Sequence, residues 1–516
     1  MSENMILIGF MGTGKDTIGR LLADRLNMGF ISTDEMIELA EQKTIKEIFE
    51  ENGEDCFRKK EKWVIKEIKR LKNVVIGTGG GIVIDPENRT KLKKIGRVIH
   101  LSANLDTLRK RIITEGKRPL IKSIADIDRL YRKRNGIYDF AQVRIDTTDK
   151  KPDGVVNEII DRLNLKIIRL IKKEAKVIIK TKSKNYPVII GCDIINRIPV
   201  SNNKIVIITN PLVGALYLNK IIGQLKRRKN EIDYFIIPDG EEFKNFETVN
   251  KIYDFLFRIN FQRSNCIISL GGGVITDITG FVASTFKRGC RLIHIPTTLL
   301  GQIDAGIGGK TGIDTVYGKN MLGTFYQPEL VLCDLKKLLT LSENEFTNGI
   351  AEVIKYGVIR SKRLFRILQR EKESLKNRNL QVLFDIVKEC VSIKGSIIDK
   401  DETEEKGIRE ILNFGHTIGH TIETVTNYKN YSHGEAISMG TVEEMNLFGK
   451  RARERDEVIK LLKDYSLPIS VPFRIRKKIK NFILQDKKIK GKYITIPVFE
   501  RIGRVRIKEV SCKRLF

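Results

Sequence analysis

The chain has 516 residues, of which 41% are hydrophobic and 31% charged, and its formal net charge is +30. This length exceeds what one hydrophobic core covers, so we expect two to four domains, and the lack of a run of about 18 apolar residues or of a signal-peptide layout predicts a cytoplasmic protein without a membrane span. The charge would suit nucleic acid, but no tract interleaves basic with aromatic residues, which favours anionic small molecules as partners instead.

The first 165 residues alternate β-rich runs with helical stretches. The runs MILIGF, NVVIGTGGG and RVIHLSA are typical of strands, and the alternation predicts a parallel sheet with crossover helices. Apolar side chains then recur at Val155, Ile159, Leu163, Ile167 and Ile171, which predicts one amphipathic helix or two abutting helices. We therefore expect a rigid junction here and not a flexible linker.

The sequence GFMGTGKD matches the phosphate-binding pattern GxxxxGK and lies between a predicted strand and a predicted helix. In such a loop backbone N–H groups surround phosphates, the lysine neutralises them, and the helix N-terminus adds a favourable dipole. The pattern predicts nucleotide binding by Gly12, Thr13, Gly14, Lys15, Asp16 and Thr17. The residue after the lysine is usually Ser or Thr, whose hydroxyl meets magnesium, but in this chain it is Asp16.

Further motifs follow in a recognisable order. Asp34 comes after the second predicted strand, Arg58 lies in DCFRKKE, three glycines close NVVIGTGGG, Arg118 begins RPL, and Arg134 stands four residues before a tyrosine. Each of these could be structural by itself, as a helix cap, a turn or surface charge. Together they resemble shikimate kinase over residues 1–165.

This resemblance implies a P-loop kinase domain over residues 1–165 that transfers a phosphoryl group from ATP, with Mg²⁺, to shikimate. Arg58 and Arg134 would hold the substrate carboxylate by charge-assisted hydrogen bonds, and Asp34 would orient or deprotonate the attacking hydroxyl. Lys15 and Arg118, the latter on a lid, would stabilise charge on the transferred group. The glycine turn would let the substrate ring approach closely. Its residues are Gly79, Gly80 and Gly81.

A second departure from the family accompanies Asp16. The family usually has an acidic residue two positions before Asp34, which reaches magnesium through water, but this chain has Ser32. The hydroxyl and the carboxylate have therefore exchanged places across the expected metal site. Our hypothesis is that Asp16 ligates magnesium while Ser32 orients a water, and the alternative is a weakened or inactive kinase.

A second α/β series begins near residue 175. The runs VIIK, PVIIG, KIVIIT, YFIIP and NCIISLGGG are typical of strands, whereas after about residue 340 helical patterns prevail until ITIPV near the end. We expect an α/β domain over residues 166–340 and a mostly helical domain over residues 341–516.

Motifs in this second part resemble 3-dehydroquinate synthase from about residue 175 to the C-terminus. They are PDGEEFK, NCIISLGGGVITD and HIPTTLLGQIDAGIGGKTG. The resemblance implies that residues 166–340 bind NAD, because backbone amides at a glycine turn suit a pyrophosphate. The residues implied are Asp239, Gly240, Glu241, Lys244, Gly272, Gly273, Val274, Asp277, Thr297, Thr298, Lys310, Lys319 and Thr340. Asn210 stands where the family usually has an aspartate, so we expect altered cofactor affinity but not lost binding.

Three of the five histidines fall between residues 416 and 433. His416 and His420 are four residues apart in a segment with helical spacing, so both imidazoles face one way, as metal ligands or as ordinary polar residues. The resemblance decides between these: it implies that Glu352, His416 and His433 bind zinc or cobalt with an open position for substrate oxygens, and that His420 is an acid/base or phosphate-contacting residue.

The resemblance also implies the reaction of this second half. A heptulosonate phosphate would be oxidised by NAD, lose phosphate, be reduced again and close to a ring, a net lyase reaction with dimerisation through this half of the chain. Lys310, Lys355, Arg409 and His420 are the implied catalytic residues. Substrate phosphate and carboxylate would be held by Lys310, Lys319, Asn320, Lys355, Lys394, Arg409 and Asn413, the last one helical turn before His416.

The combined prediction is a fused enzyme of aromatic amino-acid precursor synthesis, with a shikimate kinase half and a 3-dehydroquinate synthase half. Three alternatives remain. The kinase half could bind nucleotide without turnover, the synthase half could be another sugar-phosphate cyclase with the same NAD and metal machinery, and the whole could be a basic nucleic-acid-binding protein.

Overall fold

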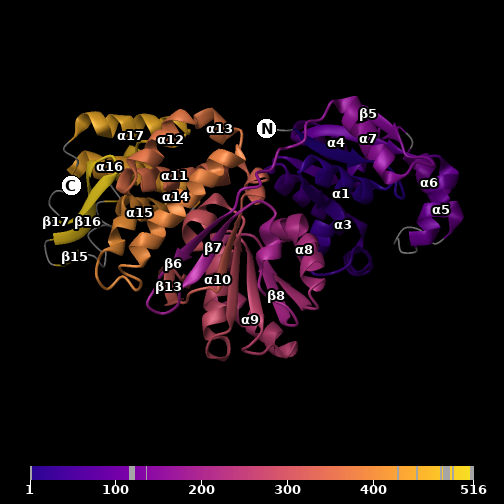
Figure 1. The fold of residues 1–516 in the computed structure, drawn as a ribbon. Coiled ribbons are helices and arrows are strands. Elements are labelled where there is room, and N and C mark those ends of the chain that lie inside the picture. The colour runs from indigo at the N-terminus through magenta and orange to yellow at the C-terminus, as the bar shows by residue number, and fades with distance from the viewer. Residues whose placement is uncertain are drawn as a thin grey trace. The chain divides into compact units, whose positions relative to one another are not determined.

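A computed structural model describes residues 3–115, 123–134, 136–426, 429–448, 451–476, 479, 489–490 and 493–511 (Figure 1). The chain forms two compact units. Unit 1 comprises Met1–Leu170, Ile207–Phe243 and Leu339–Ser342, and unit 2 comprises Ile171–Val206, Lys244–Leu338 and Glu343–Phe516. Within the described ranges, no helix has both the length and the apolar character needed to span a membrane.

The first part of unit 1 alternates strands and helices as predicted. In chain order they are β1 (Asn4–Ile8), α1 (Lys15–Leu26), β2 (Gly29–Ser32), α2 (Thr33–Glu41), α3 (Ile45–Ile68), β3 (Val74–Gly77), α4 (Pro86–Ile95), β4 (Gly96–Ser102), α5 (Leu105–Glu115), α6 (Ile124–Lys133), β5 (Val143–Asp146) and α7 (Pro152–Leu163). The five strands are parallel in the order β2-β3-β1-β4-β5. The predicted parallel sheet with crossover helices is therefore confirmed.

The apolar runs of this sheet are buried because helices cover them. Leu7 of β1 and Val75 of β3 share one core cluster with Ile18 and Leu22 of α1 and with Ile159 of α7. Buried on both faces, such strands need continuous apolar sequence, which is what the run MILI supplies.

The predicted continuation of the junction helix to Ile171 is wrong. α7 ends at Leu163, because Asn164 adopts the left-handed conformation (φ 46°) and its N–H bonds back to the last turn. The residues that follow, up to the strand at Ala175, form neither helix nor strand. Part of the apolar repeat beyond α7 still packs, since Leu165 and Ile168 lie against the core of the first sheet.

The second α/β series contains a second sheet with its helices and, apart from that sheet, a two-stranded hairpin. They are β6 (Ala175–Ile179), β7 (Tyr186–Gly191), β8 (Lys204–Thr209), α8 (Pro211–Lys226), β9 (Glu231–Ile236), α9 (Phe246–Arg258), β10 (Cys266–Gly271), α10 (Gly273–Thr285), β11 (Arg291–Pro296), the hairpin β12 (Lys310–Thr315) and β13 (Gly318–Phe325), and β14 (Leu330–Asp334). The sheet order is β6-β7-β14-β11-β10-β8-β9. β6 is antiparallel to β7, whereas β7, β14, β11 and β10 pair in parallel.

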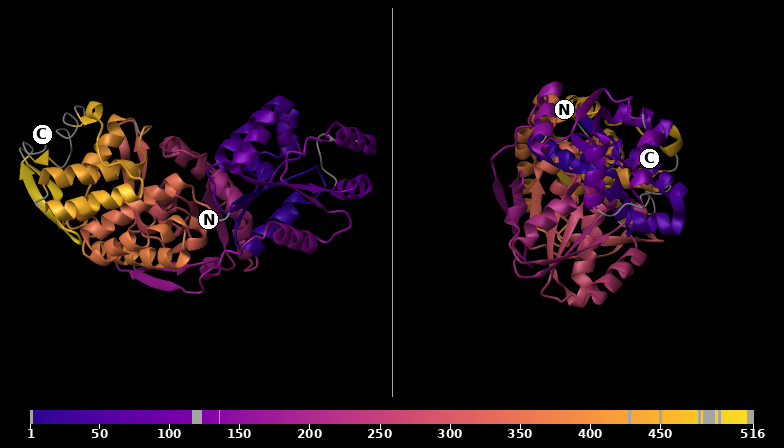
Figure 2. Two further views of the ribbon diagram at one scale, coloured as in Figure 1. Left: turned by 90° about the horizontal axis from the view of Figure 1, so that it is seen from above. Right: turned by 90° about the vertical axis from the view of Figure 1, so that its right-hand side faces the viewer.

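Helices dominate the rest of unit 2, as predicted, and lie together in the orange-to-yellow region of Figures 1 and 2. They are α11 (Glu343–Ile359), α12 (Lys362–Arg370), α13 (Lys372–Lys376), α14 (Leu380–Ile398), α15 (His416–Val425), α16 (His433–Phe448) and α17 (Ala452–Asp464). The strand predicted at ITIPV is present in a final sheet of β15 (Ile489–Lys490), β16 (Tyr493–Arg501) and β17 (Arg504–Ser511).

Glycines let α15 and α16 approach each other to backbone contact. A Cβ atom placed on Gly440 of α16 would lie 2.1 Å from the carbonyl oxygen of Gly415, and one placed on Gly419 would lie 2.6 Å from the Ile437 side chain. Gly415 also has a left-handed φ of 78°, and its N–H donates to Glu444 Oε2 at 2.8 Å. This close crossing fixes where the histidines of the two helices meet.

We predict that Gly440→Ala destabilises the chain by about 1–3 kcal/mol, because its methyl group would collide with backbone that cannot move away. The measurement is the midpoint of thermal unfolding of the full chain by circular dichroism. Gly223→Ala in α8 is the matched control: a Cβ there meets nothing within 4 Å, so this helix substitution should be neutral or stabilising by about 0.5–1 kcal/mol. Equal midpoints for the two variants would contradict the close crossing.

Candidate active sites

The phosphate-binding loop lies between β1 and α1, as the sequence predicts. Gly12 and Gly14 have left-handed φ angles of 78° and 81°, which bend the chain into the start of the helix. Lys15 is buried, and its Nζ donates to the carbonyls of Gly9 and Phe10 at 3.0 Å each. The result is a glycine loop with a lysine beside the N-terminus of a helix, an arrangement suited to a polyphosphate.

The turn after β3 (residues 79–81) gathers three of the predicted substrate residues. A Cβ on its first glycine would lie 2.2 Å from Asp34 Oδ1, and one on its third glycine would lie 2.4 Å from Arg58 Nη1. Arg134 Nη1 donates to the carbonyl of the middle glycine at 3.0 Å. Side chains from α2, α3 and the end of α6 thus meet at one strand end, although Arg118 lies outside the described residues.

Sequence reasoning missed Glu61, one turn beyond Arg58 on α3. Arg58 Nη1 donates to Glu61 Oε2 at 2.7 Å, and Glu61 is 1% exposed. Burial of the carboxyl, only partly offset by the Arg58 guanidinium, raises the pKa of Glu61 to about 7. The i, i+3 spacing of an arginine and a glutamate was the only signal available in the sequence, and it is common on helix surfaces.

The two exchanged residues of the kinase motif are neighbours. Ser32, the last residue of β2, places its Oγ 3.5 Å from Asp16 Oδ2. Asp16 also lies against the end of β3, because a Cβ on Gly77 would be 2.5 Å from Asp16 Oδ1. One carboxylate and one hydroxyl therefore lie beside the phosphate loop and Lys15.

The second glycine turn begins α10 directly after β10. The chain reverses there at Gly272 and Gly273, where Cβ atoms would lie 3.2 Å from Thr298 Cγ2 and 3.5 Å from Ala305 Cβ. The first turn of α10, which includes Val274, leaves backbone N–H groups without helical partners, and such groups suit a pyrophosphate. Thr297 is buried in the segment that follows β11.

Lys244, Asp277 and Asn320 form one network. The Lys244 Nζ donates to Asp277 Oδ2 and to Asn320 Oδ1, both at 2.6 Å, and the lysine is 3% exposed. Lys319 precedes Asn320 on β13. Residues predicted separately for the cofactor and the substrate are thus hydrogen-bonded to each other.

The remaining predicted cofactor residues belong to unit 1. Asn210 caps α8 by accepting the Val213 N–H at 2.9 Å, and its Nδ2 donates to Asp239 Oδ1 at 2.9 Å. An aspartate at position 210 would keep the cap but would repel Asp239. Gly240 and Glu241 follow Asp239, and the buried Thr340 bonds to the Tyr217 hydroxyl.

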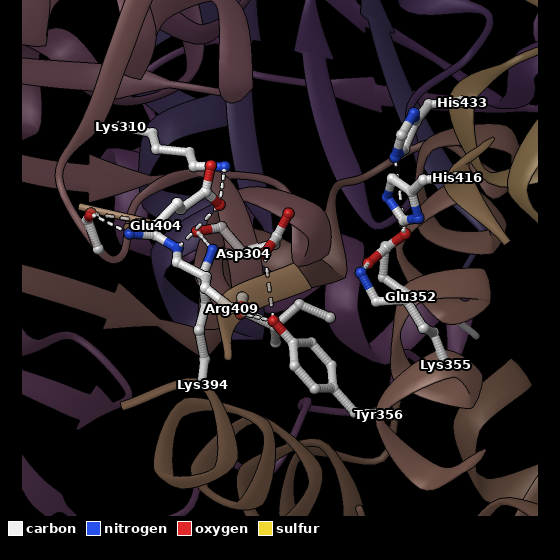
Figure 3. Close-up of polar contacts among 12 residues, drawn as sticks. Asp304, Lys310, Glu352, Lys355, Tyr356, Lys394, Glu404, Arg409, His416 and His433 are labelled. Atoms are coloured by element: carbon white, nitrogen blue, oxygen red, sulfur yellow. Dashed lines mark hydrogen bonds and ion pairs between the residues drawn. The ribbon is translucent and has the colours of Figure 1, made fainter. Parts of the chain in front are cut away.

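Three helices bring the predicted metal ligands together (Figure 3). The Nε2 atoms of His416 and His433 lie 3.5 and 3.6 Å from the same oxygen, Glu352 Oε1. Glu352 is fully buried, and within the described part of the chain this oxygen accepts no hydrogen bond. A desolvated carboxylate oxygen that faces two imidazole nitrogens fits a divalent cation.

The Nδ1 atoms of both histidines face acceptors. His416 Nδ1 is 3.1 Å from the Phe414 carbonyl oxygen, and His433 Nδ1 is 3.3 Å from Glu423 Oε1. Burial and the nearby Lys355 lower the pKa of His416, whereas Glu352 and Glu423 overcome burial and raise the pKa of His433 to about 10. His420, by contrast, is exposed on the same helix as His416.

A second group of charges lies beside this centre (Figure 3). Lys355 pairs with Glu352, and Lys394 of α14 pairs with Asp304, which also accepts a hydrogen bond from the Tyr356 hydroxyl at 3.1 Å. Burial outweighs Asp304 and lowers the pKa of Lys394 to about 8. Asp304 was not predicted, because only the fold brings it to the lysine.

Glu404 connects two of the predicted anion-binding residues. Its carboxylate lies 2.5 Å from Lys310 Nζ and 3.5 Å from Arg409 Nε. Arg409 is buried, and Nη1 donates to the Glu402 carbonyl at 2.7 Å. The prediction that Asn413 lies one helical turn before His416 is wrong, because the left-handed Gly415 separates the short helix Arg409–Asn413 from α15.

Comparisons with known proteins support both halves of the chain. The shikimate kinase family model matches residues 11–164, and those for the N-terminal and C-terminal parts of 3-dehydroquinate synthase match residues 234–348 and 349–489. The chain therefore combines a P-loop kinase domain with the fold of an NAD-dependent cyclase. A synthase from Thermodesulfovibrio yellowstonii is 44% identical over 317 residues, which is 60% of this chain and 88% of that protein.

One relative spans both halves. The bifunctional shikimate kinase/3-dehydroquinate synthase of Thermotoga maritima is 37% identical over 515 residues, 98% of each chain. The chain belongs to this bifunctional family, so the predicted fold class and pair of enzyme activities are confirmed.

Solved structures also share the second fold. The 2-epi-5-epi-valiolone synthase of Streptomyces hygroscopicus, with NAD⁺ and Zn²⁺ bound, covers 65% of this chain and 96% of its own length at a TM-score of 0.60 and 24% identity. A 2-deoxy-scyllo-inosose synthase with NAD⁺ and Co²⁺ covers 66% of this chain and 98% of its own, at a TM-score of 0.57 and 21% identity. At these identities the likeness establishes the fold.

We predict that Glu61 makes the stability of unit 1 depend on pH. The folded chain keeps the Glu61 proton up to about pH 7, whereas the ordinary pKa of a glutamate is 4.5, so stability falls as the pH rises through this window. Glu61→Gln should remove that dependence, which is worth at most about 3 kcal/mol. The measurement is the unfolding midpoint at pH 5 and at pH 7.5.

Glu54→Gln is the matched control, because Glu54 pairs with the same Arg58 from an exposed position. It should keep the parental difference between the two pH values. The same loss of pH dependence in both variants would show that the arginine pair, and not the buried carboxyl, is responsible.

Proposed function

We propose that the chain phosphorylates shikimate with ATP at one site, and at the other converts 3-deoxy-D-arabino-heptulosonate 7-phosphate to 3-dehydroquinate with release of phosphate. The single observation that carries the second activity is the buried Glu352 oxygen facing His416 and His433. The gathering of Asp34, Arg58 and Arg134 at one glycine turn supports the first.

In the kinase half, Arg58 and Arg134 would bind the shikimate carboxylate, because guanidinium groups make charge-assisted bonds to carboxylates. Asp34 would then orient the hydroxyl that attacks, and Lys15 would hold the ATP phosphates with the amides of the glycine loop. Arg118 keeps its proposed role as the lid residue.

We place the kinase magnesium ion at Asp16 and Ser32. A carboxylate and a hydroxyl are ligands that Mg²⁺ accepts directly or through water, and both lie beside Lys15. The site thus keeps one carboxylate and one hydroxyl. Here the carboxylate comes from α1 and the hydroxyl from β2, which is the reverse of the usual family arrangement.

In the synthase half, NAD would be held by the amides of α10 and by Lys244 and Asp277. When bound, NAD accepts and returns a hydride, and the metal polarises the substrate hydroxyl and ketone oxygens. Glu352, His416 and His433 would hold a zinc or cobalt ion with coordination left open. His420, exposed beside them, would exchange protons with substrate or contact its phosphate.

The substrate anions would be bound by the basic residues around Asp304 and Glu404. Lys394 and Arg409 are buried beside Asp304 and Glu404, and cationic side chains make strong charge-assisted hydrogen bonds to phosphate and carboxylate oxygens. Retention of Arg409 favours a carboxylate-bearing substrate over the substrates of other sugar-phosphate cyclases. The remaining members of this set are Lys310, Lys319, Asn320, Lys355 and Asn413. A homodimer and a cytoplasmic location stay predictions.

We predict that His416→Ala and His433→Ala each abolish bound metal and dehydroquinate formation, whereas His420→Ala keeps the metal and loses rate. The measurement is metal analysis together with assay of both half-reactions on one preparation. Shikimate phosphorylation is the internal control and should persist in all three variants. Equal metal loss in all three would contradict the ligand assignment, and a parental chain without dehydroquinate formation in the presence of zinc and NAD would overturn the proposed function.

We predict that Asp16→Asn weakens Mg²⁺-dependent ATP binding by about tenfold or more, because a charged ligand is lost. Calorimetric titration with ATP, with and without Mg²⁺, measures this effect separately from turnover. Asp24→Asn near the other end of α1 is the control. The exchange Asp16→Ser with Ser32→Asp should leave turnover near the parental value, and a large rise would show that the natural kinase site is impaired.

A further inference from the structure

Glu423 is a buried carboxylate between two of the site histidines. It lies on α15, seven residues after His416 and three after His420, so the three side chains share one helix face. Its side chain is 9% exposed. Glu423 Oε1 lies 3.3 Å from His433 Nδ1, and Oε2 lies 4.0 Å from His420 Nε2.

The surroundings of His433 match those of His416 in one respect. In each ring Nδ1 faces an oxygen acceptor, and Nε2 faces Glu352 Oε1. A histidine that ligates a cation through Nε2 is a neutral imidazole with one N–H, and an acceptor at Nδ1 keeps that proton on Nδ1. The lone pair of Nε2 is then directed toward Glu352 in both histidines, as ligation of a shared ion requires.

The two acceptors differ in kind. His416 bonds to the Phe414 carbonyl, two residues before it in the chain, so its orientation is fixed locally. His433 stands at the first position of α16, and its acceptor is a carboxylate from a different helix. A carboxylate is a stronger acceptor than a carbonyl and increases the basicity of the ring that it bonds.

We propose that Glu423 is a positioning residue for the metal centre: its carboxylate holds His433 as the Nδ1-protonated tautomer with Nε2 aimed at the ion. This inference rests on the proposed metal site at Glu352, His416 and His433. Helix packing does not require the carboxylate, because glycine contacts and apolar side chains already join α15 to α16. Burial of a charge costs stability unless it is paired, and the partners here are the two imidazoles.

The test is the affinity of the full chain for Co²⁺, measured by competition with a chromophoric chelator and by the visible absorption of the bound ion. Glu423→Ala should weaken binding by about 10- to 100-fold and shift the cobalt bands, with one ion still bound at saturation. Glu423→Gln should weaken it less, by about three- to tenfold, because an amide oxygen still accepts the Nδ1 proton. Glu443→Gln, on the same helix as His433 and paired with Arg476 on the surface, should match the parent.

Each other outcome has a distinct meaning. Parental affinity and spectrum in both Glu423 variants would overturn the positioning role. Loss of the bound ion in both variants to the extent seen in His433→Ala would make Glu423 a ligand and would also overturn it. If Glu423→Ala fails to fold, the near-isosteric Glu423→Gln decides, and no change in its affinity is the contrary result. A parental chain that binds no Co²⁺ would defeat the metal site itself.

Discussion

The structure of unit 2 depends on the burial of one carboxylate. Glu352 has no exposed surface, and its Oε1 faces two imidazole nitrogens while Lys355 pairs with the other oxygen. A charge in this position must be compensated, because its desolvation costs several kcal/mol. The compensation comes from α11, α15 and α16 together, so the positions of the three helices are tied to the electrostatics of one residue. Lys355 and His433 hold the pKa of Glu352 below its ordinary value although burial acts against them.

The two halves of the chain solve a similar problem in similar ways. In each, a strand of a mainly parallel sheet runs into a glycine turn and then a helix, at residues 9–15 after β1 and at Gly272 after β10. Backbone amides at a turn of this kind suit any phosphate, and so they carry little specificity. Specificity must come from side chains delivered by neighbouring elements. The three departures from the usual family residues, Asp16, Ser32 and Asn210, are among these side chains.

The sequence was sufficient for elements whose signals are local. Strands with continuous apolar runs, the helix over His416 and His420, and both glycine turns are where pattern and spacing place them. The end of α7 and the break at Gly415 were missed, because a single left-handed residue outweighs an apolar repeat. Glu61, Asp304 and Glu423 could not be assigned roles, since acidic residues are common on helices and only tertiary packing reveals which are buried beside a site.

The glycine contacts between α15 and α16 contribute little hydrophobic stabilisation. Glycines allow close approach but bring no side chains, so the crossing itself buries little apolar surface. The apolar packing that holds the two helices together comes instead from a cluster in which Ile418 and Ile422 of α15 and Met439 of α16 pack with Ile494 and Ile496 of β16. A strand near the C-terminus, which contains none of the predicted site residues, therefore braces the helices that carry the histidines. The geometry of the predicted metal site therefore also depends on the packing of Ile494, which lies some sixty residues after the last predicted ligand, His433.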